Sequence, residues 1–175
     1  MFDIEPISLV ISMVIMLLFS TPFVIFKRKQ SKKIKAQKLF LDQWQNKAGL
    51  KFDQSDDWRD RYFIGLDSER KVLVYVIFDA ENTVHQIDLS KASDVKVLKM
   101  EREVKVEGKT TNVIDSLSLK IDLMGEKEAA KILEFYDSDL FSDNLGELPL
   151  IQKWQEKLKA ILKNNHISSK KSILK

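Results

Sequence analysis

The side chains best suited to binding chemistry in this 175-residue chain are basic, and they are concentrated in one short segment near the N-terminus. The segment contains no acidic residue, and its basic residues are Lys27, Arg28, Lys29, Lys32, Lys33, Lys35 and Lys38. Beside a membrane, each basic residue contributes about 1 kcal/mol toward binding anionic lipid headgroups. We therefore treat this segment as a candidate contact for anionic lipid, although it could also serve only as a topology signal.

A second and weaker candidate for headgroup binding consists of Lys51, Arg59 and Arg61. If Arg59 and Arg61 lie on one strand they share a face, and their guanidinium groups could bind a phosphate together. Three carboxylates crowd the same segment, namely Asp56, Asp57 and Asp60. The alternative interpretation is therefore a solvent-exposed strand whose charges neutralise one another.

Catalytic and cofactor-binding signatures do not accompany these clusters. The chain has no cysteine, its two histidines, His85 and His166, do not form a recognisable zinc pattern, and its five glycines stand singly. A dinucleotide fingerprint and a P-loop are therefore excluded. The acidic residues Asp137, Asp139, Asp143 and Glu147 resemble a calcium loop only loosely, because Phe141 occupies a ligand position. We expect a non-enzymatic protein without cofactor or metal; the minor alternative is a membrane-bound enzyme with an unfamiliar carboxylate site.

An uncharged apolar segment, residues 7–26, lies directly before the basic residues. As a helix it would be about 30 Å long, which matches the hydrocarbon thickness of a bilayer. Acidic residues precede this segment and basic residues follow it, which is opposite to a cleaved signal peptide. The positive-inside rule then predicts a single-pass membrane protein with residues 1–6 outside and the rest in the cytoplasm. Pro22 predicts a mild kink, with Ser20 and Thr21 helping to satisfy the carbonyl that the proline frees.

The remaining chain is predicted to form a helix, a run of strands and a second helix. Residues 27–49 favour a juxtamembrane helix that ends at Gly49, and residues 50–163 a folded domain. We expect strands at Arg61–Leu66, Val72–Phe78, Thr83–Leu89, Asp94–Val106, Ser116–Leu123 and Ala129–Tyr136. Val72–Phe78 is apolar on both faces, which predicts a central strand covered on each side. An amphipathic helix with Pro149 in its first turn should follow from about Leu148 to Lys163, where Asn164 or Asn165 can close it. Residues 164–175 should form a flexible tail.

This domain resembles the pleckstrin-homology-like and GRAM-like domains of bacterial single-pass membrane proteins over about residues 50–163. The resemblance rests on Trp58 through Ile64-Gly65-Leu66-Asp67, on Val72–Phe78, on Ile87-Asp88-Leu89-Ser90 and on the closing helix from Leu150 to Leu162. It implies an antiparallel barrel or sandwich of six or seven strands capped by a C-terminal helix, which binds lipids, peptides or other subunits through loops or a sheet edge.

These observations lead to one functional hypothesis and one alternative. The leading hypothesis is a membrane-anchored cytoplasmic domain that acts as a non-enzymatic adaptor or assembly subunit, with the bilayer and either a protein partner or a second copy as its contacts. The alternative is a module that senses anionic lipid at the inner membrane surface. Because the folded domain is net acidic, we expect no binding to nucleic acid.

Overall fold

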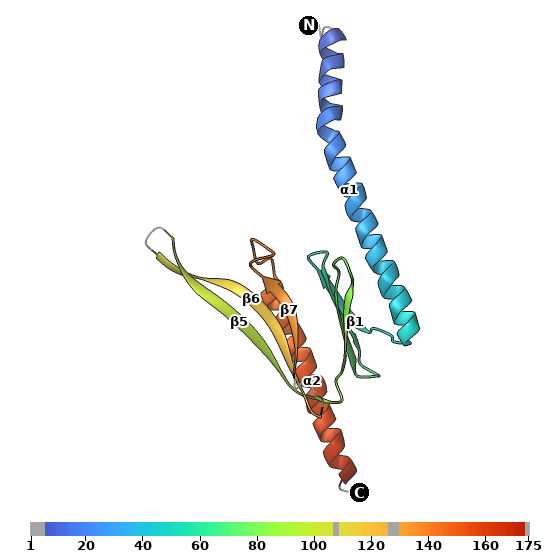
Figure 1. The fold of residues 1–175 in the computed structure, drawn as a ribbon, viewed down its shortest axis with the longest axis vertical. Coiled ribbons are helices and arrows are strands. Elements are labelled where there is room, and N and C mark those ends of the chain that lie inside the picture. Colours follow the sequence, from blue (N-terminus) through green and yellow to red (C-terminus); the bar gives the residue numbers. More distant parts are fainter. Residues whose placement is uncertain (1–5, 107–108, 126–129, 174–175) are drawn as a thin grey trace, which may run out of the picture. The chain divides into compact units, whose positions relative to one another are not determined.

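The computed structural model describes residues 6–106, 109–125 and 130–173. The chain divides into two compact units, Met1–Lys51 and Phe52–Lys175. The first contains the long helix α1 (Pro6–Ala48), and the second contains strands β1 to β7 and the helix α2 (Glu147–Ile173) (Figure 1).

Helix α1 is one continuous element that includes both the predicted apolar span and the predicted juxtamembrane helix. Its N-terminal part is long and apolar enough to cross a membrane. The predicted end at Gly49 is confirmed, because Gly49 has a left-handed φ of 63° and its N–H donates to the Asn46 carbonyl at 3.2 Å. The N–H of Leu50 donates to the Gln45 carbonyl at 3.1 Å. Glycine suits this position because it lacks the Cβ atom that disfavours positive φ.

The proline in α1 changes the local hydrogen bonding in a way that the sequence analysis did not anticipate. Pro22 has no N–H, so the carbonyl of Leu18 loses its helical partner. The hydroxyls of Ser20 and Thr21 instead donate to the carbonyls four residues before them, at 2.7 and 2.6 Å. The prediction that they satisfy the freed carbonyl is therefore wrong, because each short side chain reaches back along its own turn. Figure 1 shows that α1 bends along its length.

The strands form two separate antiparallel sheets. The first has the order β1 (Gln54–Trp58), β2 (Tyr62–Asp67), β3 (Val72–Ile77) and β4 (Thr83–Asp88), and the second has the order β5 (Ala92–Val106), β6 (Lys109–Leu123) and β7 (Ala130–Asp137). All six predicted strands are present, and five of them have ends within two residues of the prediction. Two features were not predicted. The first is strand β1 itself, which contains Asp56 and Asp57. The second is the start of β6 at Lys109 rather than Ser116, because pairing with β5 holds its polar first half in a strand.

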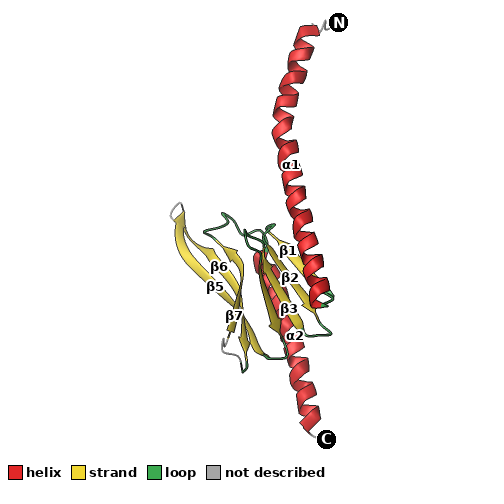
Figure 2. Cartoon of the chain, turned by 45° about the vertical axis from the view of Figure 1, so that its right-hand side comes forward, coloured by secondary structure: helices red, strands yellow, loops and turns green. Residues whose placement is uncertain are grey.

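The main hydrophobic core lies between the two sheets and α2 (Figure 2). Alternate residues of β6 enter it, and Leu117, Leu119 and Ile121 are fully buried. The expectation that the third strand is covered on both faces is confirmed, since its four central residues, from Leu73 to Val76, are all buried.

A glycine in β2 is required by close packing rather than by its backbone angles. A Cβ atom on Gly65 would lie 2.9 Å from the Phe63 ring and 3.0 Å from the Phe52 ring. Because these distances are shorter than ordinary van der Waals contacts, only glycine fits without displacement of a ring.

Helix α2 presents the predicted apolar face, with Ile151, Trp154, Leu158 and Leu162 buried in the core. Pro149 lies in its first turn, as predicted. The helix then continues past its predicted end at Lys163 as far as Ile173, where we expected a flexible tail. No glycine or proline stands between these two positions to stop it.

Candidate functional site

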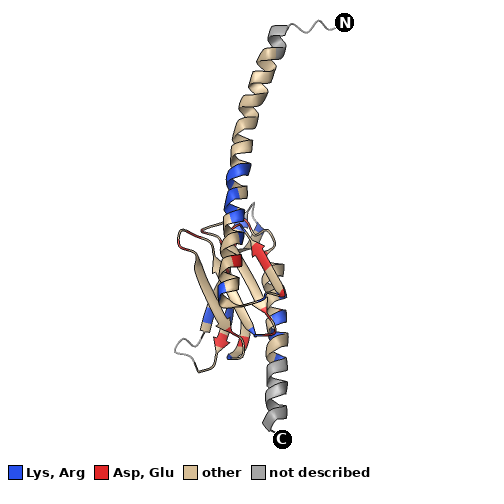
Figure 3. Cartoon of the chain, turned by 90° about the vertical axis from the view of Figure 1, so that its right-hand side faces the viewer, with Lys and Arg blue, Asp and Glu red and all other residues tan. Residues whose placement is uncertain are grey.

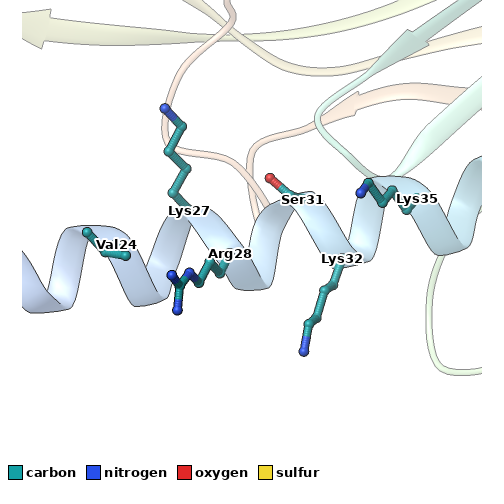
Figure 4. A pocket seen from close by; sticks show the side chains of 6 residues that line it. All are labelled: Val24, Lys27, Arg28, Ser31, Lys32 and Lys35. Atoms are coloured by element: carbon teal, nitrogen blue, oxygen red, sulfur yellow. The ribbon is translucent and has the colours of Figure 1, made fainter.

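The basic segment of α1 is a surface feature. All seven of its basic side chains are exposed, and none forms an ion pair with any residue in the described part of the chain. Figure 3 shows this basic band directly after the uncharged part of α1. Val24, Lys27, Arg28, Ser31, Lys32 and Lys35 line a shallow open hollow, and Figure 4 shows that Lys27 and Lys32 point to opposite sides of the helix.

The basic side chains surround α1 instead of occupying one face. At about 100° per residue, the seven positions cover roughly two thirds of the helix circumference. The remaining third contains Ile34, Gln37 and Leu41. A helix lying in the plane of a membrane gathers its basic residues on one face, whereas a helix that passes through the headgroup layer meets headgroups on all sides. The distribution therefore suits a helix that crosses the membrane surface.

The second candidate set is divided by the structure. Lys51 belongs to the first unit, whereas Arg59 and Arg61 lie in the second, in the turn between β1 and β2. Arg59 and Arg61 therefore do not lie on one strand, which was the condition for a shared phosphate site. The guanidinium of Arg61 lies 5.6 Å from the centre of the Tyr62 ring, and its buried Nε has no hydrogen-bond partner.

Arg59 is held by two acidic residues from the segment before α2. Its Nε donates to the buried carboxylate of Glu147, its Nη1 donates to the Asp143 carboxylate at 3.1 Å, and its Nη2 donates to the Asp143 carbonyl. The other Glu147 oxygen accepts the N–H of Leu145 at 2.7 Å. The hydrogen bond to Glu147 raises the pKa of Arg59. This network fastens the β1–β2 turn to the start of α2. It therefore gives a structural role to Asp143 and Glu147, two of the four acidic residues that loosely resemble a calcium loop.

An open cleft of about 490 Å³ lies beside this network. Its lining residues are Trp58, Arg59, Asp60, Leu145, Gly146, Glu147 and Leu150. Each guanidinium nitrogen of Arg59 already donates a hydrogen bond to Glu147 or Asp143, so the charge of Arg59 is paired with carboxylates inside the fold. The cleft offers apolar contact, chiefly through the exposed side chain of Leu145.

One of the three carboxylates near Arg59, that of Asp56, links β1 to α2. Asp56 accepts hydrogen bonds from the indole Nε1 of Trp154 at 2.8 Å and from Nζ of Lys153 at 2.7 Å. Trp154 is fully buried, so Asp56 satisfies a polar group that has no access to water. The neighbouring Asp57 is exposed. The sequence analysis treated both carboxylates as solvent-exposed and missed this difference.

Side chains of the first sheet satisfy backbone groups on the edge strand of the second. The indole Nε1 of Trp58 donates to the Phe135 carbonyl at 2.9 Å, and the hydroxyl of Tyr75 donates to the Glu134 carbonyl, both on β7. The Tyr62 hydroxyl donates to the Glu134 carboxylate. Burial raises the pKa of both tyrosines above the ordinary value. These bonds join the two sheets along one side and occupy acceptors that an edge strand would otherwise expose.

Metal binding receives no support from the part of the chain that the structure covers, because no group of three or more potential ligands occurs among the described residues. His85 lies in β4 and stacks against Tyr75, with ring centres 6.1 Å apart. His166 lies in the last part of α2, whose side chains are outside the description.

No family model, curated protein or solved structure matches the chain. The resemblance to pleckstrin-homology-like domains therefore stays a prediction.

Proposed function

We propose that this chain is a single-pass membrane protein whose second unit is a cytoplasmic pleckstrin-homology-like domain that acts as a non-enzymatic adaptor or assembly subunit. The observation that carries the proposal is the continuity of α1, in which an apolar stretch of membrane-spanning length leads directly into exposed basic residues. A chain of this form is held in the membrane, with its basic end on the cytoplasmic side.

Two antiparallel sheets around one core, closed by an amphipathic C-terminal helix, support the pleckstrin-homology-like part of the proposal. The non-enzymatic part rests on how the polar residues are used. Asp56, Arg59, Asp143 and Glu147 bind one another or nearby structural groups, and they leave no nucleophile and base pair directed into the cleft. A surface with these properties is suited to binding rather than to catalysis.

Cysteine labelling tests the membrane arrangement, because the chain has no native cysteine. Ser172→Cys should react with an impermeant maleimide only after cells are lysed, whereas the matched variant Phe2→Cys should react in intact cells. Labelling of Ser172→Cys in intact cells would overturn the cytoplasmic assignment. Extraction of the protein by alkaline carbonate would overturn membrane insertion itself.

Purification in mild detergent tests the adaptor role. The full chain should retain a stoichiometric protein partner or form a stable complex with itself. Truncation of Leu145 by Leu145→Ala should weaken a contact made at the cleft, whereas Leu140→Ala, at a second exposed leucine, should leave it unchanged. A protein that is monomeric and without a partner under these conditions contradicts the adaptor role.

Sensing of anionic lipid is the second candidate function, and it is favoured by the exposed basic residues of α1 that have no ion-pair partner in the described chain. Phosphatidylglycerol should bind the detergent-solubilised protein more tightly than phosphatidylcholine, and salt should weaken the difference. Replacement of Lys32, Lys33 and Lys35 by glutamine should remove most of this preference. The control replaces three exposed lysines of the second unit, Lys105, Lys109 and Lys159. Binding that ignores lipid charge would exclude this function.

A further inference from the structure

The β5–β6 hairpin extends beyond the rest of its sheet. β7 pairs with β6 only from Ser116 to Asp122, whereas β5 and β6 remain paired out to Val106 and Lys109. The outer part of the hairpin, residues 98–106 and 109–115, is called the arm here, and Figure 1 shows it projecting away from β7 and α2. A two-stranded ribbon is marginally stable in water, so a further strand would stabilise the arm.

The sheet has two edge strands, β5 and β7, and only the first part of β5 is covered. There α2 packs against β5, and the side-chain amide of Gln155 donates to the Val95 carbonyl at 3.3 Å. Further along the strand the side chains are exposed, including Leu98 and Met100, which is 66% exposed. The unpaired backbone groups of such an edge are a template for another strand.

The pleat of β5 restricts how the strand can meet a second copy of itself. Val95 and Val97 point toward the core, and Lys99 and Glu101 share their face while Met100 lies on the other. A β-bulge lies between Met100 and Glu101, but its extra residue is Asp115 on β6, and Glu101 still pairs with the core-facing Ile114. Directly opposed residues of antiparallel strands lie on the same face. In a symmetric pair, the two-fold axis must therefore place one residue directly opposite its own copy; an axis that placed a residue opposite its sequence neighbour would pair side chains on different faces.

Among two-fold axes at Lys99, Met100 and Glu101, charge favours the axis at Met100. An axis at Lys99 places that residue opposite its own copy, and an axis at Glu101 does the same for a carboxylate, and both arrangements oppose like charges. An axis at Met100 places Lys99 of each copy opposite Glu101 of the other and brings the two Met100 side chains together. Within one chain these two charges already lie 2.6 Å apart, which shows that they pair readily on this face. Charged side chains often protect an edge strand, but here they alternate in sign and become complementary.

We propose that two copies of the chain pair antiparallel through residues 96–104 of β5, with the two-fold axis at Met100. The two three-stranded sheets then form one continuous sheet, and each arm gains a neighbouring strand. This interaction does not depend on the membrane topology proposed above, so each proposal can fail without the other.

Disulfide trapping in the full-length, detergent-solubilised protein tests the register. Opposed residues in antiparallel strands have Cα atoms about 4.5–5.5 Å apart, which is within the range of a disulfide. Met100→Cys should therefore form a disulfide-linked dimer under mild oxidation. Ile132→Cys, which is similarly exposed at 61% but lies on β7, should form no disulfide-linked dimer. Failure of Met100→Cys to link to itself, equal linking by both variants, or linking to a different protein would overturn the proposal.

Two further sets of variants make the test independent of the single cysteine. The double variant Lys96→Cys/Val104→Cys should link because these positions face each other between copies, whereas each single variant should not. Lys99→Glu should raise the dissociation constant of the dimer about tenfold, as measured by sedimentation velocity, because it opposes carboxylates at two places. Lys99→Glu/Glu101→Lys should restore it. An unchanged dissociation constant for Lys99→Glu, or no recovery in the double variant, would contradict pairing about Met100.

Discussion

Removal of the Asp56 side chain should destabilise the second unit far more than removal of the adjacent Asp57 side chain. Asp56→Ala leaves the indole N–H of Trp154, which is 0% exposed, without a hydrogen-bond partner. An unsatisfied buried donor costs about 1–3 kcal/mol. The lost ion pair with Lys153, whose side chain is 45% exposed, adds no more than about 1 kcal/mol. We therefore expect a loss of about 2–3 kcal/mol in the free energy of unfolding.

Urea unfolding of the full chain in detergent micelles, followed by near-ultraviolet circular dichroism, measures this loss. With a slope of about 2 kcal/mol per molar urea, the midpoint should fall by about 1–1.5 M. Asp57→Ala is the matched control, and as an exposed substitution it should change stability by less than about 0.5 kcal/mol. In Trp154→Phe, which lacks the indole donor, Asp56→Ala should cost less than in the native chain. Equal effects of Asp56→Ala and Asp57→Ala would refute the structural role of Asp56.

Three further outcomes concern the two buried tyrosines, the closely packed Gly65 and the hydrogen bond from Ser90 to Asp88. Burial raises the pKa of Tyr62 and Tyr75 above the ordinary value of 10.0, so the folded state keeps these protons longer than the unfolded chain. Their contribution to stability is therefore complete below about pH 10 and declines progressively as the pH rises from there toward the raised pKa values, which urea midpoints on either side of pH 10 should show. Gly65→Ala should lower stability by about 1–3 kcal/mol in thermal unfolding, because the added Cβ contacts the neighbouring ring. The hydroxyl of Ser90 donates a hydrogen bond to Asp88 and lowers the pKa of that carboxyl from its ordinary value of 3.8, so Ser90→Ala should raise this pKa in a carboxyl NMR titration. The stabilisation by Asp88 is present above about pH 4 and is lost on acidification.

Secondary structure followed the sequence wherever a local pattern carried the signal. The apolar run predicted the N-terminal part of α1, a single glycine predicted its end, and alternation in β6 predicted which residues enter the core. β1 was missed because Gln54–Trp58 lacks an apolar alternation and gains its strand conformation by pairing with β2. The end of α2 was misplaced because Asn164 and Asn165 suggested a stop, although neither residue prevents a helix from continuing.

Candidate sites, too, could be predicted where their residues are close in sequence and were missed where the residues are far apart. The basic segment of α1 was found from the sequence because its members are neighbours along the chain, and neighbours on one helix remain close in space. The links of Arg59 to Glu147, of Asp56 to Trp154 and of Tyr75 to Glu134 join residues 88, 98 and 59 positions apart. No periodicity in one sequence reveals such pairs, because they form only when distant elements pack together.

The sequence by itself determined the apolar span, the basic residues that follow it and the faces of the strands and helices, because transfer free energies and local hydrogen bonds depend on a residue and its near neighbours. Only the tertiary structure decided which charged groups are used inside the fold and which are left at the surface. It buried Glu147 and so required Arg59 beside it, and it buried Trp154 and so required Asp56. A buried polar group needs a partner, and the position of that partner is set by the packing of the whole unit.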